Sequence, residues 1–137
     1  MINRSRPRVY IAGPISKGNL QENVDRARDA ARKLIKAGAA PLCPQLTVFM
    51  SSNTPTIDGS DPDNPKNTGF DHSVWIDVDR QWVQVSQAIL RLPGESKGAD
   101  AEVEHAVGCG LPVYFSLDGL IEDIRNGAHF GGPCRDD

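Results

Sequence analysis

The chain has 137 residues, a length that suits one globular domain with a buried core. Hydrophobic residues make up 39% and charged residues 24% of the chain, which is the composition of a soluble globular protein. The formal net charge of −3 argues against a general nucleic-acid binder, and no apolar run is long enough to span a membrane.

The three cysteines, Cys43, Cys109 and Cys134, form no CxxC pair and no ligand-like cluster with the three histidines, so we expect no metal site. The N-terminal residues lack the charged, apolar and small-residue series of a signal peptide. An odd number of cysteines without such a signal is typical of free thiols in a reducing compartment. We therefore expect a cytoplasmic protein.

The first predicted element is a short buried strand over residues 8–12, which ends at Gly13-Pro14. Residues 20–37 then repeat apolar side chains at three- and four-residue spacing, which predicts an amphipathic helix. Gly38 is the expected stop of this helix, and residues 39–42 offer a second short strand.

Residues 43–70 break this pattern. The segment contains four prolines and two glycines and has no helical or strand periodicity. A stretch this long without periodicity is usually functional or disordered. We expect a long irregular loop that serves as a lid or as a contact between copies of the chain.

The remainder of the chain alternates helices and strands. Helical spacing returns over 71–86 through Val74, Val78, Trp82 and Val85. The later elements are a strand over 88–92, a helix over 98–108, a strand over 111–115, a helix over 117–125 and a flexible polar tail over 126–137.

This alternation predicts a single α/β domain over residues 1–137, a flavodoxin- or Rossmann-like three-layer sandwich with a parallel sheet of four to five strands. Ligands of such sheets bind at the carboxyl ends of the strands, where loops enter helices. We therefore expect the loop 13–19, the region before Asp79 and the loop 93–98 to lie together.

The segment 12–18, Ala-Gly-Pro-Ile-Ser-Lys-Gly, joins the first strand to the first helix. Its glycines would let the backbone approach a ligand, and free N–H groups at a helix start favour anions. The segment is neither a phosphate-binding P-loop nor a GxGxxG dinucleotide motif. A plain strand-to-helix turn is the alternative to a ligand loop.

Acidic side chains near helix starts are candidate reactive groups. Glu102 lies near the start of the helix over 98–108, where the helix dipole would keep its carboxylate ionised and suited to attack an anomeric carbon. The alternative is an acid that only stabilises the first turn. Asp79 could likewise be an ordinary acidic residue on the surface of a helix, and Ser96 could serve only as a helix N-cap.

Three segments occur in a characteristic order: Val-Tyr-Ile-Ala-Gly-Pro-Ile at 9–15, Asp79 followed by Trp82, and Ser96-x-Gly98-x-x-x-Glu102-x-x-x-Ala106. Together they resemble the first strand, the Asp-bearing helix and the nucleophile motif of the nucleoside 2-deoxyribosyltransferase superfamily. The resemblance includes the family's 2′-deoxynucleoside 5′-monophosphate N-hydrolase branch. It covers residues 8–115 apart from 43–70.

The resemblance implies that Glu102 is the nucleophile, that Tyr10 orients its carboxylate, and that Asp79 binds or protonates the departing base. Gly13 and Ile15 would line the sugar and base pocket. A 2′-deoxy sugar suits this chemistry, because the oxocarbenium-like transition state forms more easily without an electron-withdrawing 2′-hydroxyl.

Nucleoside-specific members of the family carry an acid six positions before the nucleophile. The corresponding residue here is Ser96, whose neutral hydroxyl would accept a phosphate that a carboxylate would repel. Ser16, with Lys17 and Gly18, would complete the phosphate clamp, and Gly98 of the same motif would also bind substrate. This favours 5′-monophosphates.

Two positions depart from the family's pattern. Gln87 stands where members often carry an aspartate just before the third strand. In addition, monophosphate hydrolases usually take a phosphate-binding hydroxyl from the last helix of a neighbouring subunit, where this chain offers only Arg125 as a phosphate ligand. Both departures bear on the phosphate preference.

We therefore predict a cofactor-free enzyme that cleaves the N-glycosidic bond of 2′-deoxynucleoside 5′-monophosphates through a covalent glycosyl-Glu102 intermediate, by hydrolysis or by transfer to another base. The alternative is a non-catalytic protein that binds or senses nucleotides. The missing glycine fingerprint disfavours a flavin or dinucleotide redox protein. The expected partners are a small deoxynucleotide or deoxynucleoside and a second copy of the chain, without nucleic acid or membrane.

Overall fold

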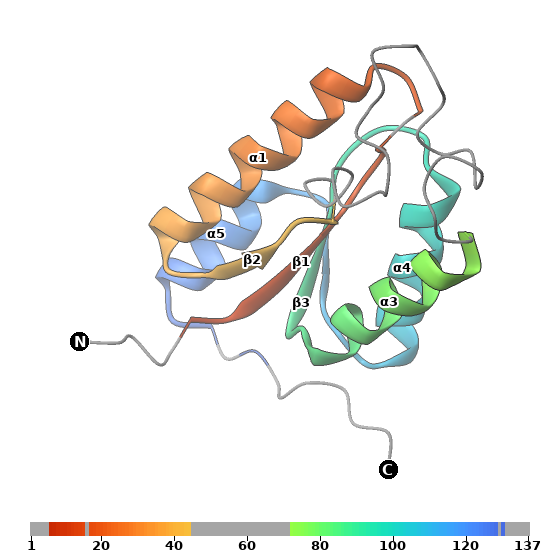
Figure 1. Ribbon diagram of the computed structural model, residues 1–137. Coiled ribbons are helices and arrows are strands. Elements are labelled where there is room, and N and C mark those ends of the chain that lie inside the picture. Colours follow the sequence, from red (N-terminus) through yellow and green to blue (C-terminus); the bar gives the residue numbers. More distant parts are fainter. Residues whose placement is uncertain (1–5, 16, 45–71, 129, 131–137) are drawn as a thin grey trace.

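Strands and helices alternate strictly along the computed structural model, which describes residues 6–15, 17–44, 72–128 and 130. The strands in this part of the chain are β1 (Arg8–Ala12), β2 (Ala40–Leu42), β3 (Ala88–Arg91) and β4 (Val113–Tyr114). The helices are α1 (Leu20–Ala37), α3 (His72–Val85), α4 (Lys97–Gly108) and α5 (Leu117–Arg125) (Figure 1). This order confirms the predicted α/β class.

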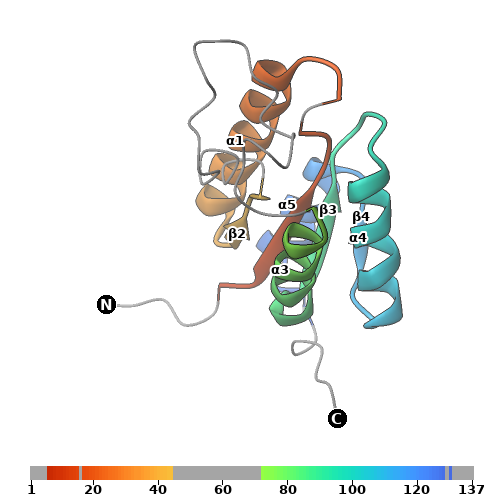
Figure 2. The same cartoon turned by 45° about the vertical axis from the view of Figure 1, so that its right-hand side comes forward.

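The described strands form one parallel sheet in the order β2-β1-β3-β4. β1 lies inside the sheet, where Tyr10 pairs with Leu42 on one side and with Ile89 on the other. Helices α1 and α5 cover one face, and α3 and α4 run beside each other on the opposite face (Figures 1 and 2). The sheet thus lies between two helical layers, as predicted.

Alternation along β1 divides its side chains between two cores. Val9 and Ile11 pack with the apolar residues of α1 and α5. Tyr10 and Ala12 point the other way and pack among residues of α3 and α4. This alternation places the single hydroxyl group of the strand under the α3–α4 layer.

Local capping groups set the limits of α1. The Asn19 side chain accepts a hydrogen bond of 3.0 Å from the backbone N–H of Glu22, which satisfies a free donor of the first turn. At the other end, Gly38 adopts φ of +104°, and its N–H donates to the Ile35 carbonyl at 3.1 Å. Gly38 therefore ends the helix as predicted, because a left-handed residue favours glycine.

Helix α3 has two different long faces. The face that packs inward carries Asp79 and the fully buried Val83. The apolar residues that revealed the helix in the sequence lie on the outward face and are exposed: Val74, Val78, Trp82 and Val85. The inward face of α3 therefore holds a carboxylic acid, while an apolar stripe faces outward.

One strand differs from the prediction made from the sequence, and one predicted loop lies mostly outside the residues that the structure describes. β4 begins later than predicted, because the Leu111 N–H bonds to the Ala106 carbonyl at 3.0 Å and so belongs to the turn that closes α4. The predicted loop over 43–70 is described only at Cys43 and Pro44. No helix among the described residues is long and apolar enough to cross a membrane.

Candidate functional site

Tyr10 lies at the centre of the candidate site. Its side chain is fully buried beneath α3 and α4, and its hydroxyl donates a hydrogen bond to a carboxylate oxygen of Glu102. Burial, together with the charges of Glu102 and Asp79, raises the pKa of Tyr10 well above its ordinary value. The hydroxyl therefore keeps its proton and acts as a donor.

Glu102 lies half-buried in the second turn of α4. It was predicted near the start of the helix, and it lies one turn beyond the first, because Ser96 caps the helix and Asp100 is the acid of its first turn. Burial opposes the expected effect of the helix dipole and raises the pKa of Glu102 from 4.5 to about 7. The hydrogen bond from Tyr10 acts against burial and lowers this pKa.

Asp79 approaches the same pair from α3. Its position on the inward face of that helix differs from the alternative of a solvated surface acid. Burial raises the pKa of Asp79 from 3.8 to about 6. The charge of Asp79 in turn raises the pKa of Glu102 and of Tyr10, so the three groups form one electrostatic cluster.

The Asp79–Tyr10–Glu102 cluster combines groups from α3, β1 and α4. Two carboxyl groups with pKa values of about 6 and about 7 share one proton between those pH values, mostly on Glu102 and in a smaller fraction of molecules on Asp79, which leaves Glu102 ionised. The phenol binds one oxygen of Glu102, which orients the carboxylate. This arrangement suits covalent catalysis assisted by a proton donor.

The loop between β1 and α1 contains Gly13 and Ile15, two predicted substrate-binding residues. Gly13 is buried and Ile15 is partly exposed, while Ser16 lies outside the described residues. The side-chain amide of Asn23, in the first turns of α1, donates to the Ile15 carbonyl at 2.9 Å and to the Lys17 carbonyl at 2.8 Å. Asn23, which the sequence analysis missed, thus holds the loop in its shape.

The loop between β3 and α4 contains the other predicted substrate-binding residues, Ser96 and Gly98. Ser96 is the N-cap of α4, and its oxygen accepts a hydrogen bond of 3.1 Å from the Ala99 N–H. Ser96 therefore does cap the helix through its oxygen, while its hydroxyl proton can still donate to a ligand. Gly98 is exposed in the first turn.

The two loops touch each other at the carboxyl ends of β1 and β3. A Cβ atom added to Gly94, which has φ of +114°, would lie 2.7 Å from Cγ of Pro14. Lys17 and Glu95 add an exposed ion pair of 3.3 Å between the same loops. The structure therefore brings the predicted loops 13–19 and 93–98 together.

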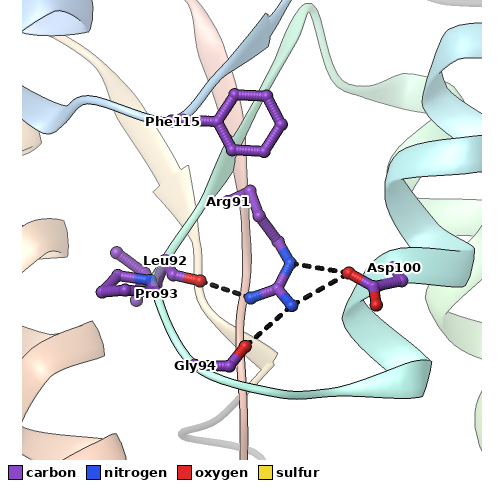
Figure 3. Close-up of a pocket in the computed structure, with 6 residues that line it drawn as sticks. All are labelled: Arg91, Leu92, Pro93, Gly94, Asp100 and Phe115. Atoms are coloured by element: carbon purple, nitrogen blue, oxygen red, sulfur yellow. Dashed lines mark hydrogen bonds and ion pairs between the residues drawn. The ribbon is translucent and has the colours of Figure 1, made fainter.

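Arg91 is a second residue that the sequence analysis missed. It is the last residue of β3 and is 9% exposed. Figure 3 shows its guanidinium directed at the carbonyl groups of Leu92 and Gly94 and at the carboxylate of Asp100. A pocket of about 360 Å³ lies beside it. The sequence feature that could have pointed to Arg91 is its place as the one charged residue within the apolar run Ala-Ile-Leu-Arg-Leu.

Gln87, which departs from the family's pattern, lies at the opposite end of the sheet. Its N–H donates to the Arg8 carbonyl at 2.8 Å, and its side-chain oxygen accepts from the Arg8 N–H at 3.1 Å. These bonds join the amino ends of β1 and β3. Gln87 therefore lies away from the loops at the carboxyl ends of the strands.

Within the part of the chain that the structure describes, no three His, Cys, Asp or Glu side chains are grouped as metal ligands. Comparison of the chain with protein-family models and with curated proteins gives no match. The assignment of a function therefore depends on the geometry of the site.

Proposed function

We propose that the protein cleaves the N-glycosidic bond of 2′-deoxynucleoside 5′-monophosphates through a covalent glycosyl-Glu102 intermediate. The observation that carries this proposal is the hydrogen bond from the buried Tyr10 hydroxyl to the Glu102 carboxylate, beside the half-buried Asp79. The resemblance of the three sequence segments to the deoxyribosyltransferase superfamily supports the same assignment.

In the first step, the free oxygen of the ionised Glu102 carboxylate attacks C1′ of the deoxyribose. The C1′–N bond breaks, its electron pair moves to the base, and Asp79 gives the base a proton. Tyr10 holds the other carboxylate oxygen, so the attacking oxygen keeps a fixed direction. The reactive form of the enzyme thus carries one proton on the two carboxyl groups, at Asp79, and it is the less populated of the two singly protonated forms because Glu102 has the higher pKa.

In the second step, a water molecule or a free base attacks C1′ from the opposite side. The ionised Asp79 takes the proton of the attacking group, and the bond between C1′ and Glu102 breaks to return the carboxylate. Water gives hydrolysis, and a free base gives a new nucleotide. The two outcomes share one intermediate and differ only in the group that intercepts it.

The 5′-phosphate is assigned to the contact between the two loops. Ser96 retains a hydroxyl proton there, beside the backbone N–H groups of the first turn of α4, which include Gly98. A dianionic phosphate at this position gains charge-assisted hydrogen bonds. Lys17 is within the same region, and a bound phosphate would compete with Glu95 for its ammonium group.

The test is incubation of the purified protein with a panel of 2′-deoxynucleosides and their 5′-monophosphates, with and without an added free base. Chromatography then separates the released bases and any new nucleotide. We expect base release from the monophosphates. Binding of the monophosphates without release would instead favour the non-catalytic nucleotide-binding alternative.

The Ser96→Asp variant tests the phosphate assignment in the same assay. A carboxylate at position 96 would repel the phosphate and offer a partner to a free 5′-hydroxyl. We expect the ratio of kcat/KM for a monophosphate to that for its nucleoside to fall below the wild-type ratio. An unchanged ratio would remove Ser96 from phosphate recognition.

A further inference from the structure

We propose that Arg91 is a positioning residue for Glu102, because its buried guanidinium fixes the start of α4 and places a positive charge where it favours the ionised carboxylate. This inference rests on the proposed role of Glu102 as the nucleophile. Arg91 follows Ile89 at alternate positions of β3, and its register partner in β1 is Ala12. Arg91 therefore lies on the same face of the sheet as Tyr10.

The Arg91 guanidinium bonds both to the loop that precedes α4 and to the first turn of α4, the helix that carries Glu102. It donates to the Leu92 carbonyl and to the Gly94 carbonyl, the latter at 2.9 Å, and both carbonyls belong to the loop between β3 and α4. It also donates to Asp100 Oδ1 from Nε at 3.2 Å and from Nη2 at 2.9 Å. Asp100 lies two residues before Glu102, so these bonds fix the helix next to the nucleophile.

The charge of Arg91 acts on Glu102 more strongly than the charge of its partner does. The Arg91 side chain is 10% exposed, whereas the Asp100 side chain is 70% exposed and is screened by solvent. The charged and titratable groups that act on Glu102 are Tyr10 from β1, Asp79 from α3 and Arg91 from β3. Arg91 and Tyr10 lower the pKa of Glu102, while burial and Asp79 raise it.

This balance decides which carboxyl group carries the shared proton. Because the pKa of Glu102 is the higher of the two, most singly protonated pairs carry the proton on Glu102, and Arg91 and Tyr10 enlarge the fraction that carries it on Asp79. That is the arrangement in which Glu102 attacks C1′ and Asp79 protonates the base. Arg91 thus acts on the nucleophile through its charge and through its bonds to the first turn of α4.

The test uses Arg91→Gln, Arg91→Lys and Asp100→Asn, with Arg32→Gln as a control that removes one exposed positive charge from α1. The first readout is the titration midpoint of Glu102, which is measured by NMR of protein labelled with ¹³C-glutamate. The second readout is the pH dependence of kcat/KM for base release. Both are measured on the full chain.

We expect Arg91→Gln to raise the midpoint of Glu102 by about one pH unit or more, and Arg91→Lys to raise it by less, since lysine keeps the charge. Asp100→Asn should move the midpoint in the opposite direction, because it removes the negative charge paired with Arg91. Arg32→Gln should leave it unchanged. A purely structural role for Arg91 would not give shifts of opposite sign in the Arg91 and Asp100 variants.

An unchanged midpoint in folded Arg91→Gln, or a shift of the same sign in Asp100→Asn, would overturn the inference. If Arg91→Gln does not fold, the shifts in Arg91→Lys and Asp100→Asn decide it by the same signs. The proposed function fails separately: shifts of the expected sign in a protein that releases no base would retain the effect of Arg91 on Glu102 and reject the glycosidase.

Discussion

The hydroxyl of Tyr10 donates a hydrogen bond to the carboxylate of Glu102, although 92 positions of sequence separate the two residues. Tyr10 belongs to a buried strand and Glu102 to a helix packed on it. A carboxyl group in such surroundings is costly to ionise, and the phenol is one of two groups that lower this cost.

The Tyr10→Phe variant should lose this assistance while retaining the ring that fills the core. Loss of a hydrogen bond to a charged group should raise the pKa of Glu102 and lower kcat/KM for base release at neutral pH by roughly 10- to 100-fold. Because Glu102 has the higher of the two pKa values, its rise should move the basic limb of the pH–rate profile to higher pH. A variant whose rate falls without any movement of that limb would show that Tyr10 does not act on the ionisation of Glu102.

The same burial makes a prediction about stability that does not depend on catalysis. The folded protein holds the proton of Glu102 more tightly than the unfolded chain, because its pKa rises from 4.5 to about 7 on folding. Stability contributed by the protonated form is therefore present below about pH 4.5 and is lost as the pH rises through about 7.

Glu102→Gln should abolish the loss of stability at high pH, since glutamine can still accept the hydrogen bond from Tyr10 but carries no charge. We expect the variant to exceed the wild type in free energy of unfolding by on the order of 1–3 kcal/mol at pH 8, and to match it near pH 4. Urea unfolding at both pH values measures the difference. Equal stabilities at pH 8 would mean that the carboxylate is not buried as described.

Asp79 makes a prediction about the leaving group. Asp79→Asn removes the proton donor and should reduce the rate most for bases that leave poorly, while an activated nitrophenyl-type leaving group should be affected little. The wild type should show a bell-shaped pH dependence with its maximum between about 6 and about 7, the pKa values of Asp79 and Glu102. Equal losses for both kinds of leaving group would exclude proton donation by Asp79.

We expect the outward face of α3 to take part in self-association. Val74, Val78, Trp82 and Val85 form one exposed apolar stripe, and Trp82 is 49% exposed. We expect a homo-oligomer in which this stripe packs against a second copy, and Trp82→Glu should dissociate it. Light scattering should give a mass of at least two 14.9 kDa chains for the wild type. A fully active wild-type monomer would contradict this expectation.

Local patterns predicted the architecture of the described residues well. Gly38 marked the end of α1 because a left-handed residue there favours glycine, and the side-chain alternation of β1 directs Tyr10 to one face. The sequence also implied that the loops after β1 and β3 meet, because the carboxyl ends of parallel strands share one edge. Pro14 and Gly94 make that contact.

Tertiary packing determined what the sequence did not reveal. Glu102 was predicted to be ionised by the start of its helix, but its surroundings on α3 and β1 control its pKa, and no local pattern records them. Arg91 was overlooked because a charged residue at the end of a strand is usually solvated, whereas here carbonyl groups and Asp100 enclose it.

The central claim is that Glu102 forms the covalent bond to the sugar, and the rate of base release by Glu102→Gln tests it most directly. Glu104→Gln, an equal change at an exposed position of the same helix, is the control and should retain the wild-type rate. We predict that Glu102→Gln loses about three orders of magnitude or more in kcat while it still binds the deoxynucleotide. A folded Glu102→Gln protein that keeps about a tenth of the wild-type rate would contradict the account, because loss of a covalent nucleophile cannot leave that much activity.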